Sequence, residues 1–208
     1  MGIKNGTPEA RVLRNQKLYE TLSFLEFMKK WKMERQSSGG FLDKLITSTY
    51  RIGSYRVYGK CPWYAQILLW FPEYLGKFVS QTFLNCYIWK EATIDWGFKI
   101  YHGSGITINE WAIVGKNCLF MNQTTIGATG DFQIPTLGDA VFLGVGARVL
   151  GDINVGNRVE IGANAVVTKD IPDDVHVVGA NRIIGVKEPA LSYKQIRQHY
   201  HGKLRKRN

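Results

Sequence analysis

Residues 137–167 read LGDAVFLGVGARVLGDINVGNRVEIGANAVV, and an aliphatic residue returns at every sixth position of this stretch. The recurring residues are Leu137, Leu143, Val149, Val155, Ile161 and Val167. A repeat of fixed period is one structural unit that stacks on the next. One inward aliphatic residue in six predicts a mainly β fold, a parallel β-helix with three short strands in each coil of 18 residues.

The same spacing begins upstream of this stretch. It runs through Ile88, Ile94, Ile100, Ile106, Ala112, Cys118 and Thr124. The step from Thr124 to Leu137 is 13 residues where 12 would fit, so we expect residues 128–135 to leave the coil as a loop. An ordinary β-sandwich is the alternative, because six is a multiple of the strand period of two. The column two residues after each ladder position is mixed in polarity, which favours the β-helix.

The chain divides into three predicted parts: an N-terminal helical region (1–87), the β-helix (88–187), and a short helix with a basic tail (188–208). In the first part, residues 66–84 are strongly apolar and aromatic, but their charge-free runs are too short to span a bilayer. One interpretation packs this segment on the β-helix or at an oligomer interface. The other lays it on a membrane surface as a peripheral contact.

The formal net charge of +10 is unevenly distributed. Residues 90–186 hold 7 Lys and Arg against 10 Asp and Glu, so the excess lies at the two ends of the chain. A nucleic-acid-binding protein more often places its charge on the folded surface that reads the nucleic acid, and we expect no such partner. The first 20 residues show no signal peptide, and three cysteines form no disulfide framework. We therefore expect a cytoplasmic protein, with the inner face of the membrane as a second location.

One histidine stands out among the four of the chain. His102 is the only one inside the predicted coils, two residues past Ile100, so its side chain should point outward. Surface decoration is the ordinary explanation for such a residue. However, the following Gly103-Ser104-Gly105 is a corner of small residues that leaves room for a substrate. An imidazole titrates near neutrality and can take a proton from an alcohol. A zinc enzyme with three His ligands on neighbouring coils is excluded, so we expect no metal.

Five segments resemble serine acetyltransferases in order along the chain. They are IYHGSGI (100–106), TTIGATG (124–130), LGVGARVLG (143–151), IGANAVV (161–167) and VGANR (178–182). The resemblance covers about residues 86–187. It implies a left-handed hexapeptide-repeat β-helix, an acetyl-CoA co-substrate, and a homotrimer that binds acetyl-CoA between the coils of two subunits.

The resemblance also implies roles for individual residues. His102 would be the general base that activates the acceptor hydroxyl. Seven residues would contact acetyl-CoA: Gly127, Ala128 and Gly130 beside the thioester, the backbone of Ala147 and Ala165 along the pantetheine arm, and Lys169 and Arg182 at the phosphates.

The chain departs from the family pattern around the base. Tyr87 stands where the family has the carboxylate partner of the base, Tyr101 replaces an Asp, and Ile134 replaces a second His. The residues that orient His102 are then Glu91, Asp95 or Glu110, which the sequence does not separate. Candidate acceptor contacts are Tyr87, Trp96, Tyr101, Glu110 and Asn122.

These departures resemble capsular and exopolysaccharide O-acetyltransferases of the colanic-acid type. They predict an acetyl-CoA-dependent O-acetyltransferase that acts on a sugar hydroxyl of a surface polysaccharide or its precursor. One alternative is a serine O-acetyltransferase of cysteine biosynthesis. The other is an inactive hexapeptide protein that serves as a trimeric scaffold.

Overall fold

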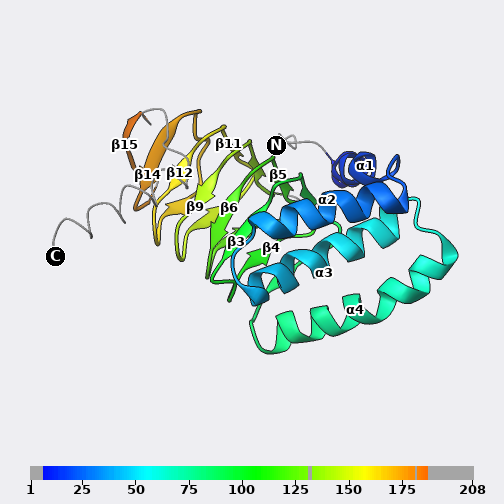
Figure 1. Cartoon of the computed structure of the whole chain (residues 1–208). Coiled ribbons are helices and arrows are strands. Elements are labelled where there is room, and N and C mark those ends of the chain that lie inside the picture. Colours follow the sequence, from blue (N-terminus) through cyan, green and yellow to red (C-terminus); the bar gives the residue numbers. More distant parts are fainter. Residues whose placement is uncertain (1–6, 131–132, 181, 187–208) are drawn as a thin grey trace, which may run out of the picture.

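The computed structural model describes residues 7–130, 133–180 and 182–186. A β-helix follows a bundle of helices that lies at its N-terminal end (Figure 1). The helices are α1 (Pro8–Tyr19), α2 (Phe24–Ser37), α3 (Phe41–Tyr58) and α4 (Trp63–Thr82). The predicted fold class is confirmed. The predicted C-terminal helix and tail lie outside the described residues.

Each coil of the β-helix contributes one short strand to each of three parallel sheets. The first sheet has the order β1-β4-β7-β10-β13, the second β11-β8-β5-β2, and the third β15-β14-β12-β9-β6-β3. In the third sheet, β15 pairs with β14 in the antiparallel direction. The strands are β1 (Tyr87–Ile88), β2 (Thr93–Ile94), β3 (Lys99–Tyr101), β4 (Thr107–Ile108), β5 (Ile113–Val114), β6 (Leu119–Met121), β7 (Thr125–Gly127), β8 (Thr136–Leu137), β9 (Phe142–Leu143), β10 (Arg148–Leu150), β11 (Asn154–Val155), β12 (Glu160–Ile161), β13 (Val166–Val167), β14 (Val175–Val178) and β15 (Arg182–Val186).

The sheets meet at three edges, which we name for what they hold. At the His102 edge the chain passes from the third sheet to the first, for example from β3 to β4. At the loop edge it passes from the first sheet to the second, and the segment between β7 and β8 leaves the coil there. At the third edge it passes from the second sheet to the third.

The register corrects the predicted coil length. Ile88 pairs with Ile108 and Ile100 with Phe120, so the first coil has 20 residues instead of 18. The two additional residues lie at the His102 edge. Between Ile126 and Leu137 the chain uses 11 residues where six would complete the step. The extra residues at both places account for the break in the sixfold spacing.

The interior holds two inward columns, not the one column that the sixfold spacing predicts. The second column lies two residues before the first and contains the small or aliphatic residues Ala112, Cys118, Ala147, Ala165 and others, all buried. From Ile106 to Thr124 the predicted ladder follows this second column. The sixfold period survives the change because both columns share it. Burial raises the pKa of the Cys118 thiol to about 12, as expected for an inert core residue.

Two separate helices replace the single helical stretch expected over residues 9–36. Ser23 ends the interruption as the N-cap of α2: its hydroxyl accepts from the Glu26 amide, and the Glu26 carboxylate accepts from the Ser23 amide at 2.8 Å. This reciprocal capping box fixes the start of α2 and turns the chain between the two helices.

The first coil has no preceding coil to pair with, so its backbone groups need other partners. A buried ion pair provides several of them. Arg51 of α3 donates to both carboxylate oxygens of Glu34 at 2.7 Å and to the carbonyls of Ile94 and Asp95. One oxygen of Glu34 also accepts from the amides of Gly97 and Phe98. Burial alone would lower the pKa of Arg51, but the Glu34 charge raises it well above its ordinary value.

Other helical side chains complete this cap. The buried Arg11 guanidinium donates to the carbonyls of Trp111 and Ile134, at 2.8 and 2.9 Å. The Tyr50 hydroxyl donates to the Ala92 carbonyl and accepts from the Ile94 amide. The helices therefore hold the base of the β-helix mainly through side chain to main chain hydrogen bonds.

The third edge is held by a ladder of short polar side chains. Asp139 accepts from the Lys116 amide at 2.8 Å, Asn157 accepts from the Asp139 amide, and Asp173 accepts from the Asn157 amide. Each side chain reaches one coil back, so this ladder fixes the stacking of neighbouring coils.

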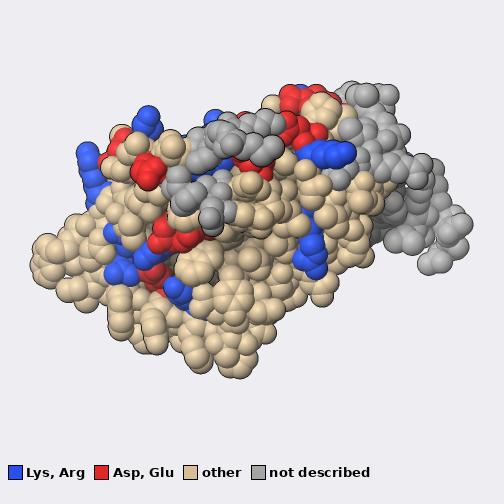
Figure 2. Space-filling model, turned by 180° about the vertical axis from the view of Figure 1, so that it is seen from behind, with Lys and Arg blue, Asp and Glu red and all other residues tan. Residues whose placement is uncertain are grey.

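The outer face of α4 is apolar and exposed. Trp63, Tyr64, Ile67, Leu68, Trp70, Phe71, Tyr74, Leu75 and Phe78 are each at least 47% exposed. The lower part of the surface in Figure 2, where α4 lies, is almost free of charged side chains. Patches of this size mark interaction surfaces. No helix in the described part of the chain is long and apolar enough to cross a bilayer.

We expect Arg51→Met to reduce the free energy of unfolding by about 3–5 kcal/mol, because it leaves the buried Glu34 carboxylate uncompensated. Urea denaturation measures this loss. Arg158→Met is the matched control, because Arg158 pairs with Asp174 on the exposed third edge and should change stability little. Equal losses in the two variants would contradict the role of the cap.

Candidate active site

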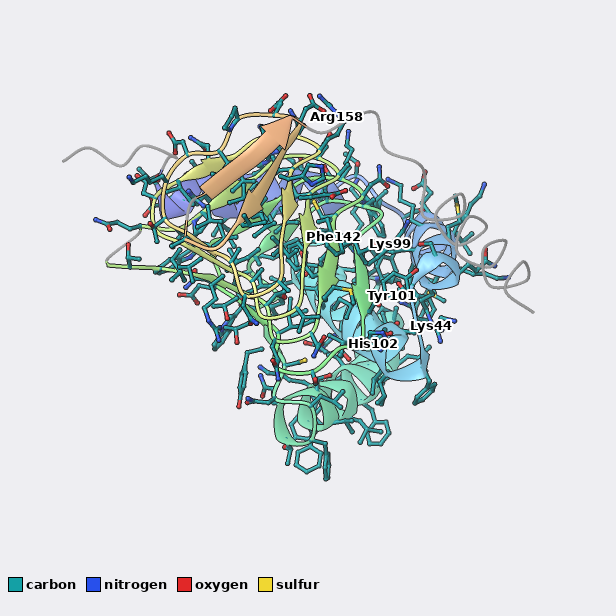
Figure 3. The ribbon with its side chains drawn as sticks, turned by 90° about the vertical axis from the view of Figure 1, so that its left-hand side faces the viewer. Lys44, Lys99, Tyr101, His102, Phe142 and Arg158 are labelled. Carbon is teal, nitrogen blue, oxygen red and sulfur yellow. The ribbon has the colours of Figure 1, made fainter. Side chains whose placement is uncertain are left out.

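His102 lies on the surface, directly after β3, as the sequence predicts. Its backbone is left-handed, with φ of 58°. This conformation is unfavourable for a residue with a Cβ, and surrounding contacts must maintain it. Figure 3 shows Tyr101 and His102 at the end of β3, in the same region of the molecule as Lys44 of α3.

The first turn of α3 packs on the corner that follows His102. The Gly103 amide donates to Oδ1 of Asp43 at 2.7 Å, and Oδ2 of Asp43 accepts from the Gly40 amide at 2.7 Å. A Cβ at Gly103 would lie 2.5 Å from Cδ1 of Ile46, so only glycine fits there. The side chain of Asp43 is buried. The helical region therefore shapes the corner that presents the imidazole.

Three of the predicted site residues share the His102 edge with the histidine. Asn122, Ala147 and Ala165 follow one another on successive coils. Backbone hydrogen bonds join the coils along this edge: the Gln123 amide donates to Ser104, and the Gly146 amide donates to Asn122. The structure therefore aligns these residues in one file above His102.

Ala147 and Ala165 offer less than the sequence suggests. Both side chains are buried, and their amides donate to Gly144 and Gly162 within the coil. Their carbonyls accept from the amides of Thr125 and Arg148. Only the second lone pair of each carbonyl is then available to a pantetheine arm. Their role in acetyl-CoA binding stays a prediction.

The remaining predicted acetyl-CoA contacts lie elsewhere. Gly127 ends β7, while Ala128, Gly130 and Lys169 are exposed at the loop edge. The width of the first sheet separates this edge from the His102 edge, roughly 15–20 Å for a six-residue step. One subunit alone does not bring both groups together. The structure describes only the backbone of Arg182, which begins β15.

The candidate acceptor contacts also divide between the edges. Tyr87 is 38% exposed on the first sheet, where it pairs with Thr107, and Tyr101 is half-buried beside His102. Glu110 lies at the loop edge. Trp96 lies at the third edge and packs against the helices: the Arg51 guanidinium stands 4.4 Å over its ring. The expectation that Trp96 contacts substrate is wrong, because the helical cap occupies its ring.

None of the carboxylates expected to orient His102 does so. Glu91 and Glu110 lie toward the loop edge, and Asp95 accepts from the Trp96 amide at the third edge. No hydrogen bond between a carboxylate and the His102 imidazole occurs among the described residues. The carboxylate that does reach this corner is Asp43, which sequence reasoning missed because it is some 60 residues away and follows no pattern.

Ile134 faces the interior and is 1% exposed. Its carbonyl accepts from Arg11, which fixes this end of the loop against α1. A side chain at position 134 cannot reach an outer substrate. The absence of a histidine there therefore carries no information about the acceptor. No group of three or more His, Cys, Asp or Glu in the described ranges is arranged to hold a metal ion.

The chain is similar to curated serine acetyltransferases. It is 39% identical to that of Synechococcus elongatus over 140 residues, which cover 64% of this chain and 57% of the relative. It is 46% identical to that of Helicobacter pylori over 92 residues, covering 43% and 54%. The chain thus spans about half the length of the curated relatives it matches. No family model matches.

Solved structures show the same fold. A serine acetyltransferase from Brucella abortus superposes with a TM-score of 0.66 at 22% identity, covering 88% of this chain and 85% of that one. A serine acetyltransferase in complex with CoA superposes with a TM-score of 0.62 at 20% identity, covering 87% and 86%. The likeness extends over the helical region as well as the β-helix.

These findings correct the expected acceptor. The sugar hydroxyl and the likeness to the polysaccharide O-acetyltransferases are wrong, because the relatives at up to 46% identity are serine acetyltransferases. The physical reason lies partly at position 134. The predicted loss of a substrate-binding histidine was inferred from a residue that the fold turns inward.

We expect His102→Gly to unfold with the same or a higher free energy than the wild type, by up to about 1 kcal/mol, because glycine adopts positive φ without strain. Urea denaturation tests this. In the control His176→Gly, the residue lies in regular strand β14, and the variant should be less stable. A clear loss of stability in His102→Gly would show that the left-handed corner is not strained.

Proposed function

We propose that the protein is an acetyl-CoA-dependent serine O-acetyltransferase that acts in the cytoplasm. The observation that supports this most is the exposed His102 at a left-handed corner, within the segment that resembles serine acetyltransferases. The exposed position gives the imidazole access to an acceptor hydroxyl. The glycines after it leave space beside the ring.

The proposed reaction is a single direct transfer. His102 takes the proton of the serine hydroxyl while the oxygen attacks the thioester carbonyl of acetyl-CoA. The C–S bond of the tetrahedral intermediate then breaks, and the imidazolium returns its proton to the departing CoA sulfur. The products are O-acetylserine and CoA, and no metal takes part.

We further propose that the active unit is a homotrimer with sites between subunits. In one chain, the base lies at the His102 edge, and the predicted contacts Gly127, Ala128, Gly130 and Lys169 lie at the opposite border of the first sheet. A neighbouring subunit that places its loop edge against the His102 edge of the first completes the site. Cyclic assembly repeats this contact around the ring.

We expect purified protein to release CoA from acetyl-CoA when L-serine is added, and His102→Ala to reduce kcat by about 10²–10⁴-fold. A thiol reagent that detects CoA measures the rate. His176→Ala is the control, because this histidine pairs with Glu160 on the third sheet and should retain activity. Near-normal turnover by His102→Ala would exclude the base, and failure of L-serine to stimulate release would exclude the acceptor.

Sites between subunits predict complementation. His102→Ala and Gly130→Trp are each expected to be inactive, the second because the indole fills the loop edge. Co-expressed from one cell, they should regain activity, because about a quarter of the sites in random mixed trimers unite an intact His102 with an intact loop. Native mass spectrometry verifies the mixed trimers. Mixed trimers without activity would place the whole site in one subunit.

A further inference from the structure

The carboxylate of Asp43 is joined to the backbone beside the proposed base. Oδ1 accepts from the Gly103 amide at 2.7 Å, one peptide unit after His102. The bond is short, as expected when the acceptor is ionised. The side chain is 5% exposed, so water competes little for this amide.

The other oxygen ties the same carboxylate to the helix. Oδ2 accepts from the Gly40 amide at 2.7 Å, and Gly40 is the N-cap of α3. At Gly39 a Cβ would lie 2.9 Å from the Tyr101 ring and 3.1 Å from the Ile100 carbonyl. The start of α3 therefore lies directly on the end of β3, and Asp43 bridges the two.

The corner has reason to need such a bridge. His102 has φ of 58°, and Gly105 has φ of 66°, so two of four consecutive residues are left-handed. This coil also has the two additional residues that later coils lack at the same edge. A corner that is both longer and strained has more alternative conformations, and a side-chain contact limits them.

We propose that Asp43 is the positioning residue of His102, an inference that rests on the proposed function. It acts through the main chain: the carboxylate fixes the Gly103 peptide, which fixes the left-handed backbone of His102 and so the direction of the imidazole. The helical region supplies the orientation that the serine acetyltransferase pattern assigns to a carboxylate at the position of Tyr87.

Activity assays with acetyl-CoA and L-serine separate positioning from binding. We expect Asp43→Ala to reduce kcat by about 10–100-fold with KM for acetyl-CoA little changed, because the base is misdirected while the co-substrate contacts remain. Asp43→Asn keeps one acceptor oxygen for the Gly103 amide and should retain more activity. Asp139→Ala is the matched control, since its carboxylate also accepts a backbone amide, but at the third edge.

A double-mutant cycle tests whether Asp43 acts through His102. In the His102→Ala background, Asp43→Ala should not reduce the residual rate further, because there is no imidazole left to position. A further 10-fold loss in that background would overturn the proposal and make Asp43 a general structural residue.

Hydrogen exchange gives a readout that is independent of the reaction. Peptides that contain Gly103 should exchange faster in Asp43→Ala and not in Asp139→Ala. Faster exchange with unchanged kcat would overturn positioning, and so would unchanged exchange. If the wild type releases no His102-dependent CoA, the proposed function fails first, and the inference falls with it.

Discussion

The buried pair of Glu34 and Arg51 is the interaction on which the first coil depends. A β-helix has an open end wherever its coils begin, and the backbone groups of that coil have no neighbour on one side. Arg51 donates to two carbonyls of the coil, and Glu34 accepts two of its amides. The two charges also neutralise each other at 2.7 Å, which makes their burial tolerable. The cap works because each partner satisfies the other as well as the backbone.

The same helices that close the open end also shape the candidate active site. Arg51 and Asp43 lie on α3, two turns apart, and one reaches the third edge while the other reaches the His102 edge. The irregular first coil, with its additional residues and left-handed histidine, is thus the coil that the helices contact. Regular coils farther along the β-helix need no such support, because they pair with neighbours on both sides. Function is placed where the repeat departs from its own rule.

The division of the site residues between two edges is a property of the triangular coil. Each sheet turns its outer face in a different direction, so residues at opposite borders of one sheet cannot meet around a small molecule. His102, Asn122 and the buried alanines share one border, while Gly127, Gly130 and Lys169 share another. A site that needs both borders is completed by another subunit. The exposed apolar face of α4 is a further surface that a second chain could cover.

The sequence by itself determined the period, and the period determined the fold. An aliphatic residue at every sixth position is enough to predict parallel coils, an interior, an outward His102 and a loop after β7, because inward and outward positions alternate locally along each strand. The period could not show the second inward column or the 20-residue first coil, since a shift of two residues keeps the same spacing. Only the tertiary structure decided that Ile134 faces inward, that Trp96 belongs to the helical cap, and that Asp43 holds the corner after His102. These contacts join residues far apart in the chain through single hydrogen bonds or ring contacts, and such contacts leave no periodic trace in the sequence.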